Sequence, residues 1–295
     1  MSAVLAILRA GPLTTIQDEG RFGMLRHGIS ASGPMDRGAF EQAGRSGRGG
    51  IEMTRAGIEF RVASGQCQIG FAGGDFTITI NGAPAQWLGM ARLGAGDVVS
   101  ITPGAWGNYG YLRFDTDLMA EAIMGSIATS SRARLGGVNG RPLQVGDVLE
   151  LAEQGTATKS AAPAHTAEGP LRIVWGLHAD LFEPLQRQKF LEASFDISSS
   201  MDRMGVRLND SCCVFAGTNI LSLASDAIVP GDVQILGDGT PIVLMRDHQP
   251  TGGYPRIATI ITADLDRFAQ LRPGTAIAFT PVTVEHAQDL LRSRR

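Results

Sequence analysis

The residues best suited to chemistry are concentrated in one stretch, residues 242–260, which reads IVLMRDHQPTGGYPRIATI. An apolar run, Ile242–Met245, opens the stretch, and a β-branched run, Ile257–Ile261, follows it; both patterns are typical of buried strands. Two adjacent glycines lie between two prolines in the connection Arg246–Arg256. Prolines restrict such a loop and glycines let a ligand approach its backbone, so the pattern indicates a rigid binding loop. The alternative is an ordinary hairpin with a Gly-Gly turn.

The sequence lacks the motifs of several common active sites. It has neither a phosphate-binding P-loop nor the Gly-x-Ser-x-Gly turn of a serine nucleophile. The glycine-rich run GRSGRGG at 44–50 lacks the strand before it and the acidic residue after it that a dinucleotide site needs. The five histidines show no metal-ligand spacing, so we expect no metal site. His27 and His248 lie in polar loops, where they are either acid–base groups or simply solvated.

Composition and charge argue against several classes of partner. The chain has 295 residues, 43% hydrophobic and 19% charged, with 38 glycines, which is typical of a β-rich globular protein. A net charge of −3 gives no field that favours nucleic acid or anionic lipid. We find no membrane-spanning run and no signal peptide. Cys67, Cys212 and Cys213 lack disulfide or zinc spacing, so we expect reduced thiols and a cytoplasmic location.

The elements that would position the loop are mostly strands. Period-two alternation and short apolar runs predict strands at 4–8, 60–62, 67–71, 76–80, 171–175, 206–208, 220–223 and 233–235, besides the two runs around the loop. Helical spacing predicts helices at 35–45, 179–193, 263–270 and 284–292. Asn81-Gly82 predicts a tight hairpin turn.

A short pattern recurs in both halves of the chain. Residues 93–99 (LGAGDVV) resemble residues 143–149 (LQVGDVL), and residues 271–277 (LRPGTAI) are a weaker copy. Each copy places a turn before an apolar strand, as where a chain enters a barrel strand. Residues 152–170 are small, polar and aperiodic, and they are typical of a linker. We therefore expect two domains, residues 1–160 and residues 161–295.

Several segments resemble one protein family. The most specific is DHQPTGGYPRIAT, within VPGDVQILGDGTPIVLMRDHQPTGGYPRIATI at Val229–Ile260. The others are SGPMD at Ser32–Asp36, MDRMGVRL at Met201–Leu208, ADLDRFAQLRPG at Ala263–Gly274, GPLTTIQDEGR at Gly11–Arg21 and LGGVNGRPLQVGD at Leu135–Asp147. Over nearly its whole length the chain is similar to the biotin-dependent carboxyltransferase family, also called the allophanate hydrolase subunit 2, Kip antagonist or 5-oxoprolinase C-subunit family. Met201 and Pro250 depart from it, since relatives commonly have serine and threonine there.

The resemblance implies a mainly β fold of two cyclophilin-like β-barrel domains with a few short helices. It implies the C-subunit of an ATP-dependent 5-oxoprolinase, which opens the pyroglutamate ring together with a Kip-inhibitor-like subunit and a larger lactam-utilisation subunit. One alternative is the carboxyltransferase module of a biotin-dependent carboxylase acting on urea or another small amide, with biotin carboxylase and biotin carrier partners. Another is a non-catalytic antagonist of a kinase inhibitor.

The same resemblance implies that this chain binds no cofactor itself. ATP or biotin would be handled by partner subunits, and neither lysine, Lys159 or Lys189, lies between methionines as a biotinylated lysine does. We therefore expect the isolated chain to be inactive.

Lactam opening and carboxyl transfer both develop negative charge on an amide or ureido oxygen, where each fixed N–H donor is worth roughly 3 kcal/mol. The resemblance then suggests donors from the backbone of Thr251, Gly252 and Gly253, with a guanidinium, and proton transfer by a nearby carboxyl or imidazole. The predicted catalytic residues are Arg203, Asp247, His248 and Tyr254. The predicted substrate-binding residues are Ser32, Met35, Asp36, Arg207, Gln234, Gln249, Thr251, Gly252, Gly253 and Arg256. Structural alternatives remain, because Asp36 could only cap a helix and Asp202 could only pair with a neighbouring arginine.

Overall fold

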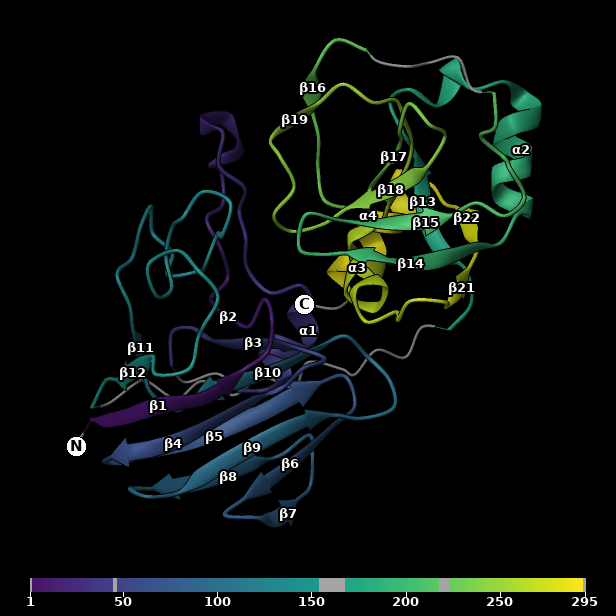
Figure 1. Cartoon of the computed structure of the whole chain (residues 1–295). Helices are drawn as coiled ribbons and strands as arrows, with labels where there is room; N and C mark the ends of the chain where they lie inside the picture. The colour runs from purple at the N-terminus through teal and green to yellow at the C-terminus, as the bar shows by residue number, and fades with distance from the viewer. Residues whose placement is uncertain (1, 45–46, 154–167, 218–222, 294–295) are drawn as a thin grey trace. The chain divides into compact units, whose positions relative to one another are not determined.

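The computed structural model of the chain describes residues 2–44, 47–153, 168–217 and 223–293. These residues form two compact units (Figure 1). The first unit comprises Met1–Phe22 and Ala31–His165, and the second comprises Gly23–Ser30 and Thr166–Arg295. The predicted domain boundary after residue 160, with most of the predicted linker, lies outside the described residues.

The first unit is built from two antiparallel sheets. The seven-stranded sheet has the order β11-β12-β1-β4-β9-β6-β7, and the five-stranded sheet has the order β2-β3-β10-β5-β8. The strands of the larger sheet are β1 (Ala3–Ala10), β4 (Ile58–Ser64), β6 (Phe76–Ile80), β7 (Ala83–Ala85), β9 (Val98–Pro103), β11 (Leu118–Met119) and β12 (Val148–Leu151). Those of the smaller sheet are β2 (Thr15–Gln17), β3 (Gly50–Thr54), β5 (Gln66–Gly73), β8 (Met90–Gly94) and β10 (Tyr109–Phe114).

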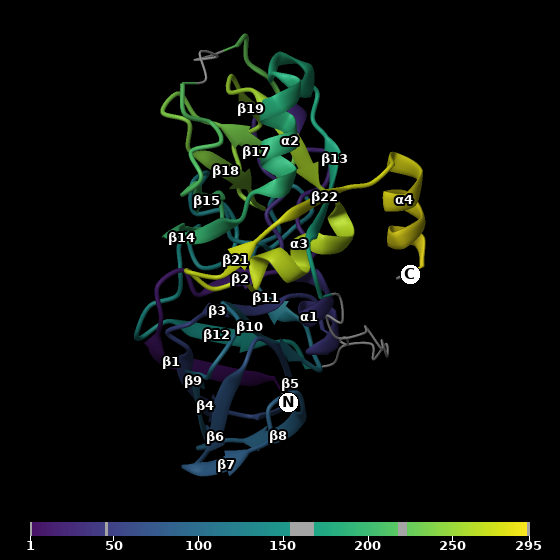
Figure 2. The ribbon, with the colours of Figure 1, turned by 90° about the vertical axis from the view of Figure 1, so that its right-hand side faces the viewer.

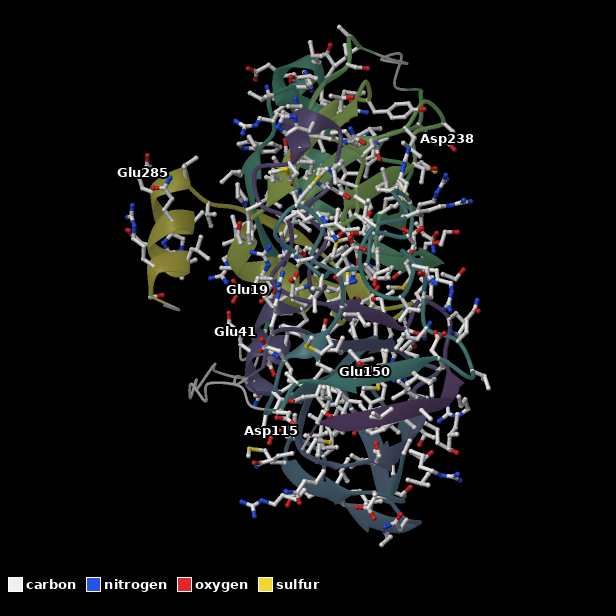
Figure 3. The ribbon with its side chains drawn as sticks, turned by 90° about the vertical axis from the view of Figure 1, so that its left-hand side faces the viewer. Glu19, Glu41, Asp115, Glu150, Asp238 and Glu285 are labelled. Carbon is white, nitrogen blue, oxygen red and sulfur yellow. The ribbon has the colours of Figure 1, made fainter. Side chains whose placement is uncertain are left out.

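Alternation of apolar and polar residues explains how this unit is packed. In β12, Leu149 and Leu151 are buried, whereas Glu150 between them is exposed on the outer face (Figure 3). Buried side chains from strands of both sheets, among them Phe60 of β4 and Ile69 of β5, form one hydrophobic core. Burial on this scale is the main source of stability for a sheet with one wet face.

The recurring turn pattern is confirmed, and every copy makes the same backbone contact. Gly96 and Asp97 exchange two hydrogen bonds with Val62, through the Gly96 N–H and the Asp97 carbonyl. In the second copy, Gly146 and Asp147 make the same two hydrogen bonds with Ile7. In the third, Gly274 and Thr275 make them with Ile197. The glycines have positive φ angles of 96°, 89° and 83°. Since only glycine adopts this conformation without cost, the repeated glycine is explained by the turn itself.

The second unit contains a nearly closed barrel. Its eight strands have the order β21-β14-β15-β18-β17-β20-β13-β22. They are β13 (Leu171–Trp175), β14 (Phe195–Met201), β15 (Gly205–Asn209), β17 (Asp232–Ile235), β18 (Pro241–Leu244), β20 (Arg256–Ile260), β21 (Ala276–Ile277) and β22 (Phe279–Pro281). The edge strands β21 and β22 are separated only by Ala278 in the sequence, so the chain itself joins the two edges of the sheet. The fold is therefore mainly β, as predicted.

The helices are few and short, and two differ from the prediction. The helix predicted at 179–193 is divided into a 3-10 turn, η2 (Ala179–Leu181), and α2 (Pro184–Glu192). Pro184 causes the division, because the residue before a proline is driven out of the helical region, and Glu183 has an extended ψ of 144°. The helix predicted at 35–45 is only α1 (Arg37–Gln42). The strand predicted at 220–223 lies almost wholly outside the described residues, and Leu223 is not in a strand.

Both C-terminal helices match the prediction closely. They are α3 (Thr262–Ala269) and α4 (Val284–Arg292). The two helices contact each other, and α4 lies outside the strands of its unit (Figure 2). A further 3-10 turn, η1 (Leu25–His27), is grouped with this unit. Among the described residues, no helix has the length and apolar character needed to cross a membrane.

Candidate functional site

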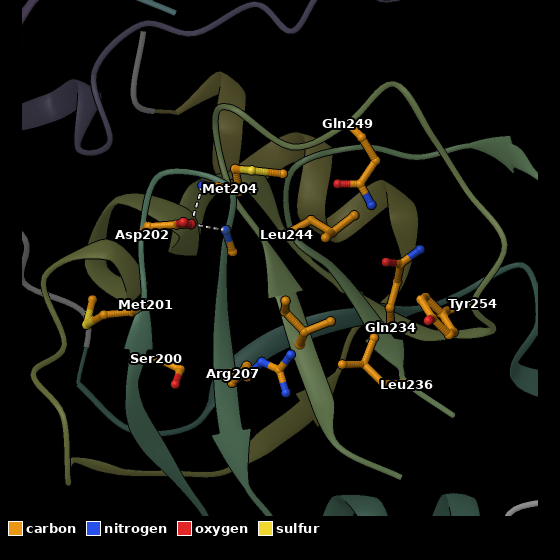
Figure 4. Close-up of a pocket in the computed structure, with 12 residues that line it drawn as sticks. Ser200, Met201, Asp202, Met204, Arg207, Gln234, Leu236, Leu244, Gln249 and Tyr254 are labelled. Carbon is orange, nitrogen blue, oxygen red and sulfur yellow. Dashed lines mark hydrogen bonds between the residues drawn. The ribbon is translucent and has the colours of Figure 1, made fainter. Parts of the chain in front are cut away.

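A pocket of about 320 Å³ opens on one face of the second unit (Figure 4). Strands β14, β15, β17 and β18 contribute residues to it. Those of β15 and β18 alternate along the strand, because side chains at i and i+2 share one face. In one row across the strands, Arg207 of β15 is opposite Ile242 of β18, which is opposite Gln234 of β17. The complete lining is Ser200, Met201, Asp202, Met204, Gly205, Arg207, Gln234, Leu236, Ile242, Leu244, Gln249 and Tyr254.

Four of the residues predicted from the sequence meet in this pocket: Arg207, Gln234, Gln249 and Tyr254. Gln249 and Tyr254 come from the connection between β18 and β20, and both lie near Gln234 in the pocket (Figure 4). Tyr254 is 39% exposed, so its ring is available to a ligand. The predicted loop therefore forms part of a pocket wall.

Gln234 is the most informative group in the pocket. It is only 1% exposed, and its Nε2 finds no hydrogen-bond partner among the described residues. A buried donor without a partner costs about 1–3 kcal/mol, so such groups are uncommon unless something else satisfies them. Gln234 belongs to the lining of the pocket, and its buried Nε2 is a candidate donor to a ligand oxygen.

The turn before β15 forms the opposite rim. Oδ1 of Asp202 accepts hydrogen bonds from the backbone N–H groups of Met204, at 2.7 Å, and Gly205, at 3.1 Å (Figure 4). An aspartate that closes its own turn in this way is a common local motif. Asp202 therefore has a structural role at the rim, through the turn rather than through the arginine pairing expected from the sequence.

Arg203, Asp247 and His248 do not line the pocket but are buried close to it. Arg203 is 4% exposed, and its Nε and Nη2 contact the two carboxylate oxygens of Asp247 at 2.8 and 3.2 Å. The Asp247 N–H donates in turn to the Arg203 carbonyl, at 2.7 Å. This two-point pairing joins the turn before β15 to the start of the loop. The structure thus gives Arg203 and Asp247 the geometry of a support, in place of the predicted direct catalytic contacts.

His248 is buried beside that pair. Its Nδ1 donates to the Gln249 carbonyl at 2.6 Å. Burial lowers the pKa of the His248 imidazole from its usual 6.5, because a charged ring would lose its hydration. The neutral ring holds the backbone next to Gln249, which is itself in the pocket wall.

The predicted donor set at the glycines is also arranged differently. Thr251 and Gly252 form β19 (Thr251–Gly252), which pairs with β16 (Asp226–Ala227) as a separate two-stranded sheet. Arg256 is 5% exposed and is bonded to acidic groups of its own unit, and neither it nor the backbone of residues 251–253 lines the pocket. These residues lie behind the pocket wall, since a Cβ added to Gly252 would lie 2.8 Å from Nε2 of Gln234.

The remaining predicted residues, Ser32, Met35 and Asp36, belong to the first unit and are fully buried there. The backbone N–H groups of Met35 and Asp36 donate to a Glu52 carboxylate oxygen and to the Tyr111 hydroxyl, at 2.7 and 2.8 Å. These bonds, like the pairing of Tyr111 with Glu52 at 3.0 Å, fix the chain as it enters α1. Burial raises the pKa of the Tyr111 hydroxyl well above its ordinary value, so it stays protonated.

Asp36 is the N-cap of α1, since its Oδ1 accepts from the Ala39 N–H at 2.9 Å. This is the structural alternative expected for Asp36. Ser32 has a φ of 56°, and its Oγ has no partner among the described residues. Within their own unit these three residues form a rigid, buried corner and expose no side chain to a ligand.

No group of three or more His, Cys, Asp or Glu side chains in the described part of the chain could hold a metal ion. The large apolar residues of the pocket lining were not predicted as site residues: Met201, Met204, Leu236, Ile242 and Leu244. Period-two spacing could have indicated the last three, because Leu236, one residue beyond β17, follows Gln234, and Leu244 follows Ile242 in β18, at the interval that shares one face.

Comparison with known proteins agrees with the motifs. The family described as carboxyltransferase domain, subdomain A and B, matches residues 27–281. The chain is 33% identical over 303 residues to the 5-oxoprolinase C-subunit of Haemophilus influenzae, covering 98% of this chain and 94% of that protein. It is 28% identical to urea amidolyase of Lachancea kluyveri, over 96% of this chain but only 17% of that much longer protein.

The fold is also known from a solved structure. The urea amidolyase of Kluyveromyces lactis superposes with a TM-score of 0.88 over 99% of this chain and 19% of that one, at 24% identity. Such identity supports the fold alone. The family match and the nearly full-length similarity to the Haemophilus influenzae protein show that this chain belongs to the biotin-dependent carboxyltransferase family, through its carboxyltransferase domain of subdomains A and B.

Proposed function

We propose that this chain is the C-subunit of an ATP-dependent 5-oxoprolinase and that the pocket of the second unit holds the lactam. The similarity to a 5-oxoprolinase C-subunit supports this choice, because it extends over 94% of that protein. The pocket volume of about 320 Å³ lies at the small end of the range for ligand sites, as a five-membered ring requires.

The observation that carries the proposal is the unpartnered Nε2 of Gln234. This amide would donate to the lactam carbonyl oxygen, on which negative charge grows during ring opening. Leu236 and Leu244 would pack against the ring carbons, and Tyr254 would cover it from the loop. Arg207 is exposed in the same row as Gln234, where it suits the carboxylate of 5-oxoproline.

A Kip-inhibitor-like subunit and a larger lactam-utilisation subunit would complete the enzyme. ATP would be bound and used by those partners. The residues of this chain would bind and orient the lactam and supply a donor at its carbonyl oxygen. We expect the isolated chain to bind substrate weakly and to turn none over.

A second candidate is the carboxyltransferase module of a biotin-dependent urea carboxylase. The similarity to urea amidolyase favours it, and the Gln234 donor would suit a ureido oxygen equally well. In that case the acceptor would be urea or a small amide without a carboxylate, and Arg207 would have no partner on it. Biotin would be supplied by a carrier and carboxylated by another subunit.

Co-expression with the proteins encoded beside it tests the proposal. We expect ATP-dependent release of glutamate from 5-oxoproline by the complex. Gln234→Leu should raise the KM about tenfold, the value of one lost hydrogen bond of about 1.4 kcal/mol. Gln188→Leu, on the exposed face of α2, is the matched control and should change nothing. Bicarbonate-dependent urea carboxylation without 5-oxoproline turnover would contradict the proposal in favour of the second candidate.

A further inference from the structure

The pocket wall is supported from behind by a short segment that the proposed chemistry does not use. We define the strap as Leu223–Ile228, which includes β16. The strap makes three backbone contacts with the loop: the Leu223 N–H donates to the Gly253 carbonyl at 2.6 Å, the Ile228 N–H donates to the Pro250 carbonyl at 3.4 Å, and β16 pairs with β19. The outer half of the loop, residues 250–253, is therefore bonded to the strap.

This support reaches the pocket through Gly252. A Cβ at this glycine would lie 2.8 Å from Nε2 of Gln234 and 3.2 Å from Cδ1 of Ile228. The Gly252 backbone is thus packed between the buried end of the strap and the buried Gln234 amide, whose Nε2 lacks a partner among the described residues. If the strap moved away from the loop, the Gly252 backbone would be free to move. The Gln234 amide, which packs against that backbone, would then lose its fixed position.

Within the described part of the chain, little else holds the strap in place. Residues 224–227 are exposed, and Ile228 is its only buried residue. A ladder of two residue pairs is only marginally stable by itself. Undocking is favoured further because Gly252 and Gly253 regain backbone entropy when they are free. A further interaction is needed to keep such a segment docked.

Arg256 supplies that interaction. Its Nη2 donates to Oδ2 of Asp226 at 2.6 Å, and its Nη1 donates to the Ala227 carbonyl at 2.7 Å. The same Nη1 lies 3.5 Å from Oδ2 of Asp232, a buried carboxylate that also accepts from the Thr259 hydroxyl at 2.7 Å. One buried guanidinium therefore contacts both residues of β16 and is anchored on the barrel by Asp232.

The opposite charges of Asp226 and Arg256 suit an ion pair that holds the strap on the barrel. The neighbouring Ala227 amide, and after it the Arg256 guanidinium, hold the pKa of the Asp226 carboxyl below its usual range, so the group is ionised at neutral pH. The Asp226 side chain is 51% exposed, whereas that of Arg256 is 6% exposed. Removing the charge of Asp226 leaves Arg256 paired with Asp232, so the barrel should still fold.

We propose that Asp226 and Arg256 are positioning residues, which dock the strap on the loop and thereby hold Gln234 in the pocket. Neither touches the ligand. The docking itself is a property of the folded chain. Only its consequence for 5-oxoproline rests on the proposed function.

Hydrogen exchange on the full chain tests the docking without any substrate. Asp226→Asn is the variant, because Asn keeps an Oδ1 that can accept from the Ala227 N–H, at 2.7 Å in the native chain, and loses the charge together with the Oδ2 acceptor of Arg256. We expect exchange in peptides covering residues 223–228 and 250–254 to rise at least threefold, with the Tm unchanged. Asp226→Glu should restore most of the protection. Asp180→Asn breaks another exposed ion pair of this unit, with Arg187 at 2.9 Å, and should leave these peptides unchanged.

Salt supplies an independent readout. Raising the ionic strength should speed exchange of the same peptides in the native chain and have no such effect in Asp226→Asn, because the ion pair is then already absent. Native exchange rates in Asp226→Asn would overturn the proposal, whatever the ligand. If the docking result holds, Asp226→Asn in the assembled complex should raise the KM for 5-oxoproline several-fold at constant kcat. Enhanced exchange with no 5-oxoproline turnover by the native complex would contradict the proposed function alone.

Discussion

We expect Gly252→Ala to separate ligand binding from the stability of the fold. The added Cβ would lie 2.8 Å from Nε2 of Gln234, and ordinary contact begins at 3.4 Å, so the amide must move by about 0.6 Å. A shift of this size exceeds the roughly 0.3 Å that separates a typical 2.9 Å bond from the 3.2 Å limit of good geometry, so the donor loses good hydrogen-bond geometry to a ligand oxygen. Loss of that bond is worth about 1 kcal/mol, or roughly fivefold in affinity.

The same change should cost the fold little. The φ of Gly252 lies outside the left-handed region, so alanine meets no backbone strain there. Replacing glycine by alanine also reduces the entropy of the unfolded chain, which stabilises the protein by about 0.4–1 kcal/mol and offsets the crowding. We therefore expect a Tm within a few degrees of the native value and a weakened affinity for 5-oxoproline.

Calorimetric titration with 5-oxoproline and thermal unfolding measure the two quantities on one sample. Gly94→Ala is the matched control, because the φ of Gly94 is also outside the left-handed region and the nearest atom to its added Cβ is 4.0 Å away. Native affinity in Gly252→Ala would refute the idea that Gln234 makes a bond to the ligand. A large loss of Tm would refute the packing argument.

Three further outcomes follow from side chains in and around the loop. Arg203→Ala should lower the free energy of unfolding in urea by about 3–5 kcal/mol, because it leaves the Asp247 carboxylate buried without its partner; an unchanged free energy would show that the pair is not a support. The folded-state pKa of His248 lies below its unfolded value of 6.5, so the unfolded chain binds more protons and stability should fall as the pH drops below about 6.5. His248→Gln should flatten that part of the pH–stability profile, and an identical slope in the variant would contradict the assignment. Tyr254→Ala should raise the KM several-fold with an unchanged Tm, since the ring is part of the pocket wall yet 39% exposed, and an unchanged KM would remove it from the site.

Much of the fold could be predicted from local patterns. A period-two run indicated the strand around Phe60, a continuous apolar run indicated the strand around Val243, and the repeated glycine turn recurs with the same backbone bonds in all three copies. The Asn81-Gly82 turn is confirmed as well, with φ angles of 52° and 80°. These signals succeed because each depends on the preferences of a few adjacent residues.

The sequence identified the stretch of chain that contributes to the pocket, but it did not identify the role of each residue in that stretch. The loop was identified from its own composition, and its Gln249 and Tyr254 do line a pocket. The roles of Arg203 and Arg256 depend on Asp247 and Asp226, which are 44 and 30 residues away in the sequence. A motif shows that an arginine is present but not which carboxylate it meets in the fold, so both were expected at the ligand. Whether the residues in the pocket bind substrate stays a prediction.

The central claim is that Nε2 of Gln234 donates to the lactam carbonyl oxygen of 5-oxoproline. Side-chain amide resonances of the chain labelled with ¹⁵N-glutamine report on this atom directly, and the signal missing in Gln234→Leu identifies it. We expect this signal to shift on addition of 5-oxoproline and to stay in place with proline, which has no lactam carbonyl. A Gln234 signal that stays in place at saturating 5-oxoproline would contradict the claim.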